Sequence, residues 1–257
     1  MKQIIKIAVS LLIFLFPVRI LKPLLCLLGY RIGRNVSVGF SLIIVDKLVL
    51  DDGARIGHGN MIFIRRLILR SAANVNRANL MSGRFSFYLD KDASIGNRNK
   101  IIRGPSPTVV DWGATLKLGE GARITADHLL DCTRSIFLGA YTILAGSGSQ
   151  IWSHGYVHDS DGPGRYRIDG RVSIGNNVYI GSRCIINLGV SISPSSTVGA
   201  GAIISKSLLY SGFYVSAPLR FLPGIQTPDR RHALRRMRSN NLCEIVYFKD
   251  SSPHVKI

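Results

Sequence analysis

The chain has 257 residues and a formal net charge of +18, with 33 Lys and Arg residues against 15 Asp and Glu residues. This length is enough for one compact domain with a sizeable core, and 26 glycines beside abundant Ile, Leu and Val are typical of a turn-dense β protein. The four cysteines form no C-x-x-C pair, which excludes the usual zinc and dithiol redox patterns, so we expect no metal, no disulfide and a reducing compartment.

Residues 1–30 are strongly apolar, but Lys6 and Arg19 bracket only twelve residues, fewer than the roughly 20 that a membrane-spanning helix needs. No small-x-small cleavage site of a signal peptide follows the apolar run. One interpretation is an uncleaved helical element in the membrane interface, which would place four cations near the headgroups: Arg19, Lys22, Arg31 and Arg34. The other is a helix that caps the open end of a solenoid. We expect a cytoplasmic protein with peripheral contact at the inner face of the cell membrane.

A period of six residues organises the domain predicted over residues 31–222. It is strictest in six consecutive hexads that begin at Ile174, Ile180, Ile186, Ile192, Val198 and Ile204. The fifth places of the first five of these hexads hold small or compact residues, namely Val178, Cys184, Val190, Ser196 and Ala202. Earlier hexads begin at Leu89, Ile95, Leu118, Ile124, Leu138 and Leu144. Such a period fits neither a helix face nor plain strand alternation, and it predicts an all-β protein, a parallel β-helix in which each hexad supplies one short strand and one corner.

The repeat is interrupted over residues 152–171, which begin with "WSHGYVHD". We predict a loop here that carries a functional histidine, His154, because imidazole titrates near neutral pH and suits a general acid and base. His158 is interpreted as an ordinary loop residue.

Residues 223–257 are predicted to be a basic extension. The run "DRRHALRRMRSNN" indicates a short basic helix, and a basic excess attracts anionic lipids, phosphorylated ligands or acidic polysaccharides. The chain has no helix-turn-helix, zinc-finger or RNP-like motif, so we expect no nucleic acid partner.

The stretch "VSIGNNVYIGSRCIINLGVSISPSSTVGAGAIISKS", followed by "SGFYVSAPLRFL", resembles the C-terminal half of the hexapeptide-repeat acyltransferases. Among them it is most similar to the sugar O-acetyltransferases that use acetyl-CoA, and the similarity runs from about Leu118 to Leu222. The resemblance implies a left-handed β-helix, usually a homotrimer with active sites between subunits. It also implies transfer of an acetyl group from acetyl-CoA to a sugar hydroxyl in surface polysaccharide synthesis, that of capsule, exopolysaccharide or lipopolysaccharide.

In this family a loop that breaks the repeat carries the catalytic histidine, and His154 matches that position. Asp131 is the first candidate for a carboxylate that orients His154, and Asp159 is the second. The resemblance further implies that a backbone N–H at the turn of Gly181 and Ser182 stabilises the oxyanion of the transition state.

The resemblance also implies a groove for acetyl-CoA. Its expected lining is Gly181, Ser182, Ala200 and Gly201, with the basic residues Lys206 and Arg220 near the phosphates. Trp152 and Tyr179 are expected to contact the acceptor sugar. Two departures affect these expectations: Tyr179 stands where the family often has Trp, and "VSAPLR" replaces a G-N-P-A-like tetrad.

Three alternatives remain open. One is an acyltransferase of the lipid A type, which depends on an acyl carrier protein. Another is a non-catalytic β-helix scaffold, which would keep the hexads without needing the histidine loop. The third is a zinc carbonic anhydrase, whose only available histidines would be His128, His154 and His158, at a spacing that does not resemble that family.

Overall fold

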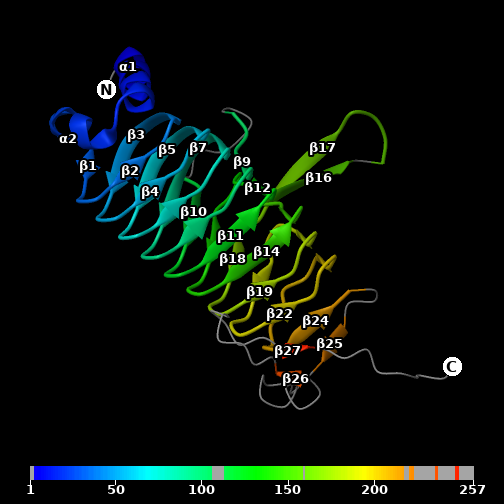
Figure 1. Ribbon diagram of the computed structural model, residues 1–257. Helices are drawn as coiled ribbons and strands as arrows, with labels where there is room; N and C mark the ends of the chain where they lie inside the picture. Colours follow the sequence, from blue (N-terminus) through cyan, green and yellow to red (C-terminus); the bar gives the residue numbers. More distant parts are fainter. Residues whose placement is uncertain are drawn as a thin grey trace.

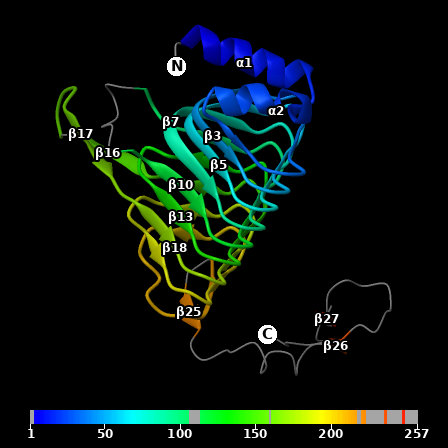
Figure 2. The same cartoon turned by 90° about the vertical axis from the view of Figure 1, so that its left-hand side faces the viewer.

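The computed structural model describes residues 3–105, 113–158, 160–216, 220–222, 235–236 and 247–248. Most of these residues form a stack of coils built from short parallel strands (Figure 1). Two helices, α1 (Gln3–Leu15) and α2 (Val18–Leu27), lie at one end of the stack (Figure 2). The predicted parallel β-helix is therefore confirmed. Its left hand, which only the family resemblance implies, stays a prediction.

Each coil passes in turn through three sheet faces. The first face holds β1 (Arg31–Ile32), the C-terminal halves of β3 (Leu42–Leu50), β5 (Met61–Leu69) and β7 (Leu80–Leu89), then β10 (Thr115–Leu118), β13 (Ile136–Leu138), β18 (Val172–Ile174) and β21 (Ser191–Ile192). The second face holds β2 (Ser37–Val38), β4 (Arg55–Ile56), β6 (Asn74–Val75), β8 (Ser94–Ile95), β11 (Arg123–Ala126), β14 (Ile143–Ser147), β19 (Tyr179–Ile180), β22 (Thr197–Val198) and β24 (Phe213–Val215). The third face holds the N-terminal halves of β3, β5 and β7, then β9 (Lys100–Ile102), β12 (Leu129–Asp131), β15 (Gln150–Ile151), β20 (Ile185–Ile186) and β23 (Ile203–Ile204).

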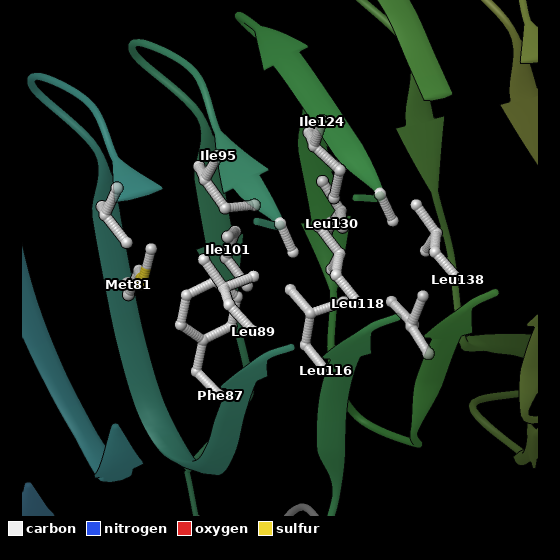
Figure 3. Packing of buried hydrophobic residues seen from close by; sticks show 14 of the residues in the cluster. Met81, Phe87, Leu89, Ile95, Ile101, Leu116, Leu118, Ile124, Leu130 and Leu138 are labelled. Atoms are coloured by element: carbon white, nitrogen blue, oxygen red, sulfur yellow. The ribbon is translucent and has the colours of Figure 1, made fainter. Parts of the chain in front are cut away.

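The hexad pattern produces the core. All six aliphatic residues that begin the strict hexads are at most 4% exposed, and the compact residues at the fifth places are at most 1% exposed. The earlier hexads behave alike, and Leu89, Ile95, Leu118, Ile124 and Leu138 point together into the interior (Figure 3). Each such side chain contributes roughly 1.5–3 kcal/mol when fully buried, so the stacked rows supply the main stabilisation of the fold.

The corner between the second and third faces contains a polar ladder, and we call this corner the ladder edge. The side chains of Asn60, Asn79 and Asn99 stack there, and the Oδ1 atom of each accepts a hydrogen bond from the backbone N–H of the next ladder residue. His128 and Ser149 continue the ladder, because the Ser149 N–H donates to His128 Nδ1 at 3.1 Å. These residues are polar and buried at the corner of their coils, and the hydrogen bonds between them satisfy their buried polar groups.

The N-terminal helices cap the stack. Val9 and Ile13 of α1 and Val18, Leu21 and Leu25 of α2 are buried against the first coils. The Ser10 hydroxyl accepts a hydrogen bond from the Ile43 N–H at 2.9 Å, which ties α1 to β3. Residues 3–27 thus cover the N-terminal end of the stack, and removing the helices would expose the end of the core.

Two segments differ from expectation. The predicted loop over residues 152–171 contains a β-hairpin of β16 (His154–His158) and β17 (Arg165–Asp169) that projects from the stack (Figure 1). In the predicted basic helix, Arg235 and Arg236 instead form β26 (Arg235–Arg236), because they pair antiparallel with β27 (Tyr247–Phe248). The other residues of that predicted helix lie outside the described residues, and β25 (Arg220–Leu222) pairs antiparallel with β24.

Candidate active site

The hairpin leaves the stack at the corner where the third face passes into the first, and we call this corner the hairpin edge. It emerges after β15 and the chain returns to the stack at β18. Tyr156, Val157, Tyr166 and Ile168 give the two strands β-forming residues, while Gly162, with φ of 72°, permits the turn between them. His154 is the first residue of β16, so it sits at the base of the hairpin against the stack.

His154 contacts the neighbouring coil through its ring. Its Nδ1 atom lies 2.7 Å from Oδ2 of Asp131, the last residue of β12. Asp131 is 2% exposed, whereas the side chain of His154 keeps 26% of its surface exposed. The carboxylate is thus inside the wall of the coil, and the imidazole stands between it and solvent.

Asp131 is held by donors on both oxygens. Oδ1 accepts a hydrogen bond from the Thr133 hydroxyl at 2.9 Å, and Oδ2 accepts from the N–H and hydroxyl of Ser153 at 3.1 and 2.9 Å. Thr133 and Ser153 are themselves buried. A carboxylate surrounded by donors is an acceptor, so Nδ1 of His154 must carry the proton in this hydrogen bond.

This tautomer leaves the lone pair on Nε2, which makes no hydrogen bond within the described part of the chain. Two aromatic rings flank the imidazole edge-on, with ring centroids 6.4 Å away for Trp152 and 5.9 Å away for Tyr156. The Trp152 Nε1–H donates to Gln150 Oε1 at 2.9 Å, which fixes the indole. The arrangement can accept a proton at Nε2 from a hydroxyl placed between these rings.

The other candidates near His154 are not part of this arrangement. His158 is exposed at the far end of β16, opposite Arg165 of β17. Asp159, the second candidate for the orienting carboxylate, lies outside the described residues.

His128 has a structural place on the ladder edge. Its Nδ1 accepts from the Ser149 N–H, and its Nε2 lies 3.0 Å from the Thr125 hydroxyl. Burial lowers the pKa of His128 to about 4, so the ring is neutral at neutral pH. Both ring nitrogens are in use, so His128 is not available as a zinc ligand, and no group of three potential ligands is placed to hold a metal within the described residues.

The residues predicted to line the acetyl-CoA groove lie on the ladder edge, away from His154. Gly181 and Ser182 follow β19, and Ala200 and Gly201 follow β22 directly beneath them, since the Gly201 N–H donates to the Ser182 carbonyl at 2.9 Å. Of the two amides at this turn, the Gly181 N–H is already used, because it donates to the Val198 carbonyl at 2.9 Å. The Ser182 N–H makes no hydrogen bond within the described residues.

The remaining predicted residues are divided among the faces. Lys206 follows β23 and is exposed on the hairpin edge, two coils beyond the hairpin. Tyr179 is exposed on the second face, so only Trp152 of the two predicted sugar contacts lies beside His154. Arg220 belongs to β25, and its side chain lies outside the described residues. Within one chain, therefore, His154 and Ser182 stand on different edges.

Sequence reasoning missed Thr133 and Ser153, which fix Asp131. Both are near the end of a coil, at the same corner in successive turns, but Ser and Thr are common at such turns and carry no distinct signal. Their proximity follows only from the register of β12 and β15.

No family model matches the chain. The galactoside O-acetyltransferase of Escherichia coli (strain K12) is 38% identical over 61 residues, which are 24% of this chain and 30% of that protein. The bifunctional protein GlmU of Acidithiobacillus ferrooxidans is 27% identical over 213 residues, 78% of this chain and 37% of that protein. This chain thus spans 30% and 37% of the length of these two curated relatives.

Among solved structures, the polySia specific acetyltransferase NeuO is similar with a TM-score of 0.52 and 16% identity, over 75% of this chain and 80% of that one. The chain therefore has the fold of a hexapeptide-repeat acetyltransferase, as the sequence resemblance implies.

Proposed function

We propose that this chain is an O-acetyltransferase that moves the acetyl group of acetyl-CoA to a sugar hydroxyl in the synthesis of capsule, exopolysaccharide or lipopolysaccharide. The observation that carries the proposal is the hydrogen bond between His154 and the buried Asp131 on a β-helix of this type. A scaffold built from the same hexads would have no use for a buried carboxylate directed at a histidine. The non-catalytic alternative is therefore disfavoured.

The proposed reaction uses His154 as base and then as acid. Nε2 takes the proton of the acceptor hydroxyl as the hydroxyl oxygen attacks the thioester carbonyl carbon, and Asp131 stabilises the imidazolium that forms. The tetrahedral oxyanion is stabilised by a backbone N–H, for which Ser182 is the candidate. When the carbon–sulfur bond breaks, Nε2 returns the proton to the sulfur of CoA. The products are a sugar acetate ester and free CoA.

A homotrimer would complete this site. His154 and Lys206 lie on the hairpin edge, while Ser182 and Gly201 lie on the ladder edge, so one chain does not bring the base and the oxyanion donor together. Copies arranged around a threefold axis would place the ladder edge of one copy beside the hairpin edge of the next at the coils of β15 to β23, with the hairpin edge of the earlier coils left open. Acetyl-CoA would then lie between subunits, with Lys206 near its phosphates.

The proposal predicts acetyl transfer that depends on both acetyl-CoA and a sugar acceptor. We expect release of the CoA thiol only when a sugar is added, together with an acetyl ester on that sugar detected by mass spectrometry. Replacing acetyl-CoA by a long-chain acyl carrier protein tests the lipid A alternative. Transfer from the carrier protein but not from acetyl-CoA would reject the proposed donor, and no transfer to any sugar would reject the proposed activity.

We also propose that α1 and α2 rest on the membrane surface. Apolar side chains on the outer side of these helices are exposed, including Ile4, Ile7, Leu11, Leu15, Ile20, Leu24 and Leu27. The one cation among the described residues of α1, Lys6, is paired with Asp46. No helix in the described part of the chain has the length and hydropathy to cross a bilayer. An exposed apolar surface of this kind, with Arg19 beside it, supports interfacial contact with anionic lipid.

The membrane proposal predicts that Leu15→Glu weakens binding to vesicles of phosphatidylglycerol and phosphatidylcholine by about tenfold, because a charge replaces a side chain that would enter the interface. Leu209→Glu is the matched control, since Leu209 is equally apolar, is 70% exposed against 63% for Leu15, and lies at the other end of the stack. Co-sedimentation measures both variants. Equal binding by the two variants would refute the membrane role of α1.

A further inference from the structure

Charge is unevenly distributed among the three edges of the β-helix. The corner between the first and second faces carries five acidic residues: Asp51, Asp52, Asp90, Asp92 and Glu120. The hairpin edge instead carries a cation in successive coils, from Lys47 through Arg65, Arg66 and Arg84 to Arg103 and Arg134. The side of the molecule that holds His154 is therefore more basic than the side that holds these carboxylates.

Most of these cations are free to bind a ligand. Lys47, Arg66 and Arg84 are exposed, and neither they nor Arg134 form an ion pair within the described residues. The hairpin arginines differ in this respect, because Arg165 stacks over Tyr156 and Arg167 pairs with Asp169 at 2.8 Å.

The one exposed carboxylate among the hairpin-edge residues of the first coils is already neutralised. Asp46 binds Lys6 of α1, and that hydrogen bond, together with the charges of Lys6, Arg84 and Arg65, lowers the pKa of Asp46. Lys6, Arg65 and Arg84 line a surface depression of about 240 Å³ beside it. The guanidinium groups of Arg65 and Arg84 thus line a recess whose one carboxylate, Asp46, is already paired with Lys6.

The row of cations leads to the candidate base. Arg66 belongs to the coil of β5, and His154 directly follows the coil strand β15. On the third face β5 pairs with β7, β7 with β9, β9 with β12 and β12 with β15, so the two residues are four coils apart. With strands about 4.8 Å apart, the row from Arg66 to His154 covers roughly 19 Å. This length suits several residues of an extended polymer better than a single sugar.

We propose that the hairpin edge binds a polyanionic glycan, an acceptor with repeated acidic groups, and presents one of its hydroxyls to His154. The inference rests on the proposed acetyl transfer and names the class of its acceptor. Exposed, unpaired arginines bind carboxylate, phosphate or sulfate groups, and their regular spacing along the coils matches a repeating ligand. A neutral glycan would offer no anionic group to Lys47, Arg66 and Arg84, the exposed cations of this edge.

The test measures glycan binding without acetyl-CoA, so that it does not depend on catalysis. The probes are polygalacturonate, dextran sulfate and neutral dextran. The test variant is R66E/R84E on the hairpin edge, and the matched control is R55E/R123E, which makes the same charge change at exposed sites on the second face. We expect R66E/R84E to weaken binding of polygalacturonate by about tenfold, with affinity that falls as salt rises, and the control to stay within about twofold of wild type.

The probes and controls also separate the alternatives. Loss of polygalacturonate binding with dextran sulfate binding retained would assign the edge to carboxylates, and equal loss of both would assign it to anionic groups in general. Equal weakening by the two double variants, or strong binding of neutral dextran, would overturn the proposal. So would vesicle binding that falls in R66E/R84E while polymer binding stays intact, since the edge would then serve lipid. Edge-dependent glycan binding without acetyl transfer to any sugar would reject the proposed activity and the presentation of a hydroxyl to His154, and would leave the glycan-binding role of the edge standing.

Discussion

His154→Ala is expected to lower the turnover number for acetyl transfer by about 10²–10⁴-fold, the usual contribution of a positioned general base. The structure supports the size of this effect, because Nε2 of His154 makes no hydrogen bond within the described residues and Asp131 fixes the tautomer. Thermal stability should change little, since His154 lies at the base of a hairpin outside the stacked core. Steady-state kinetics with a saturating acceptor, together with a thermal melt, measure both quantities.

His158→Ala is the internal control for this prediction. His158 lies in the same strand but is exposed and makes no contact with Asp131. Its replacement removes the same atoms from the same hairpin and should change turnover by no more than about twofold, as expected of a surface position. Equal losses in the two variants would show that the hairpin acts through its overall shape, and near-normal turnover in His154→Ala would end its assignment as base.

The stacked core could be predicted because its contacts repeat. Ile174, Ile180 and Ile186 occupy equivalent positions on successive faces, so a fixed spacing in sequence becomes a fixed direction in space. The same reasoning placed Cys184 at a compact corner, where it is buried. The six-residue period is therefore sufficient to predict the core wherever a residue occupies the same structural position as the residue six places before it.

The site could be predicted only in part, since its parts come from different coils. His154 is predicted because it lies where the repeat is interrupted, and Asp131 is one of two candidate partners that the sequence alone does not separate. The hairpin was missed, although alternating Tyr, Val and Ile residues around Gly162 carry a hairpin signal. The division of charge among the edges could not be predicted from the sequence, because residues such as Arg66 and Arg84 become neighbours only when coils of unequal length are aligned.

The turn of Gly181 and Ser182 shows what a family resemblance leaves open. The position of Gly181 in the hexad matches the family, yet its N–H donates to the Val198 carbonyl of the next coil. The neighbouring Ser182 N–H makes no hydrogen bond within the described residues. A resemblance identifies the turn, whereas the hydrogen-bond register decides which amide of the turn is available.

Asp131→Ala is expected to lower turnover by about as much as His154→Ala, roughly 10²–10⁴-fold, with little change in the KM for either substrate, because it frees the imidazole to adopt the wrong tautomer. Asp131→Asn should recover much of this loss. The Ser153 N–H requires an acceptor at the Oδ2 position, so the amide oxygen stays there, facing His154 Nδ1, while the Thr133 hydroxyl rotates to accept from the amide N–H. Asp131→Ala also leaves the buried Ser153 N–H and Thr133 hydroxyl without their acceptor, at a cost of about 1–3 kcal/mol each in stability, which a thermal melt will detect. The decisive comparison is the double variant D131A/H154A. Residues that act as one unit are not additive, so the double variant should turn over no more slowly than His154→Ala alone. If the loss of turnover in D131A/H154A equals the product of the losses in the two single variants, Asp131 does not act by positioning His154. The same conclusion follows if Asp131→Asn is as inactive as Asp131→Ala.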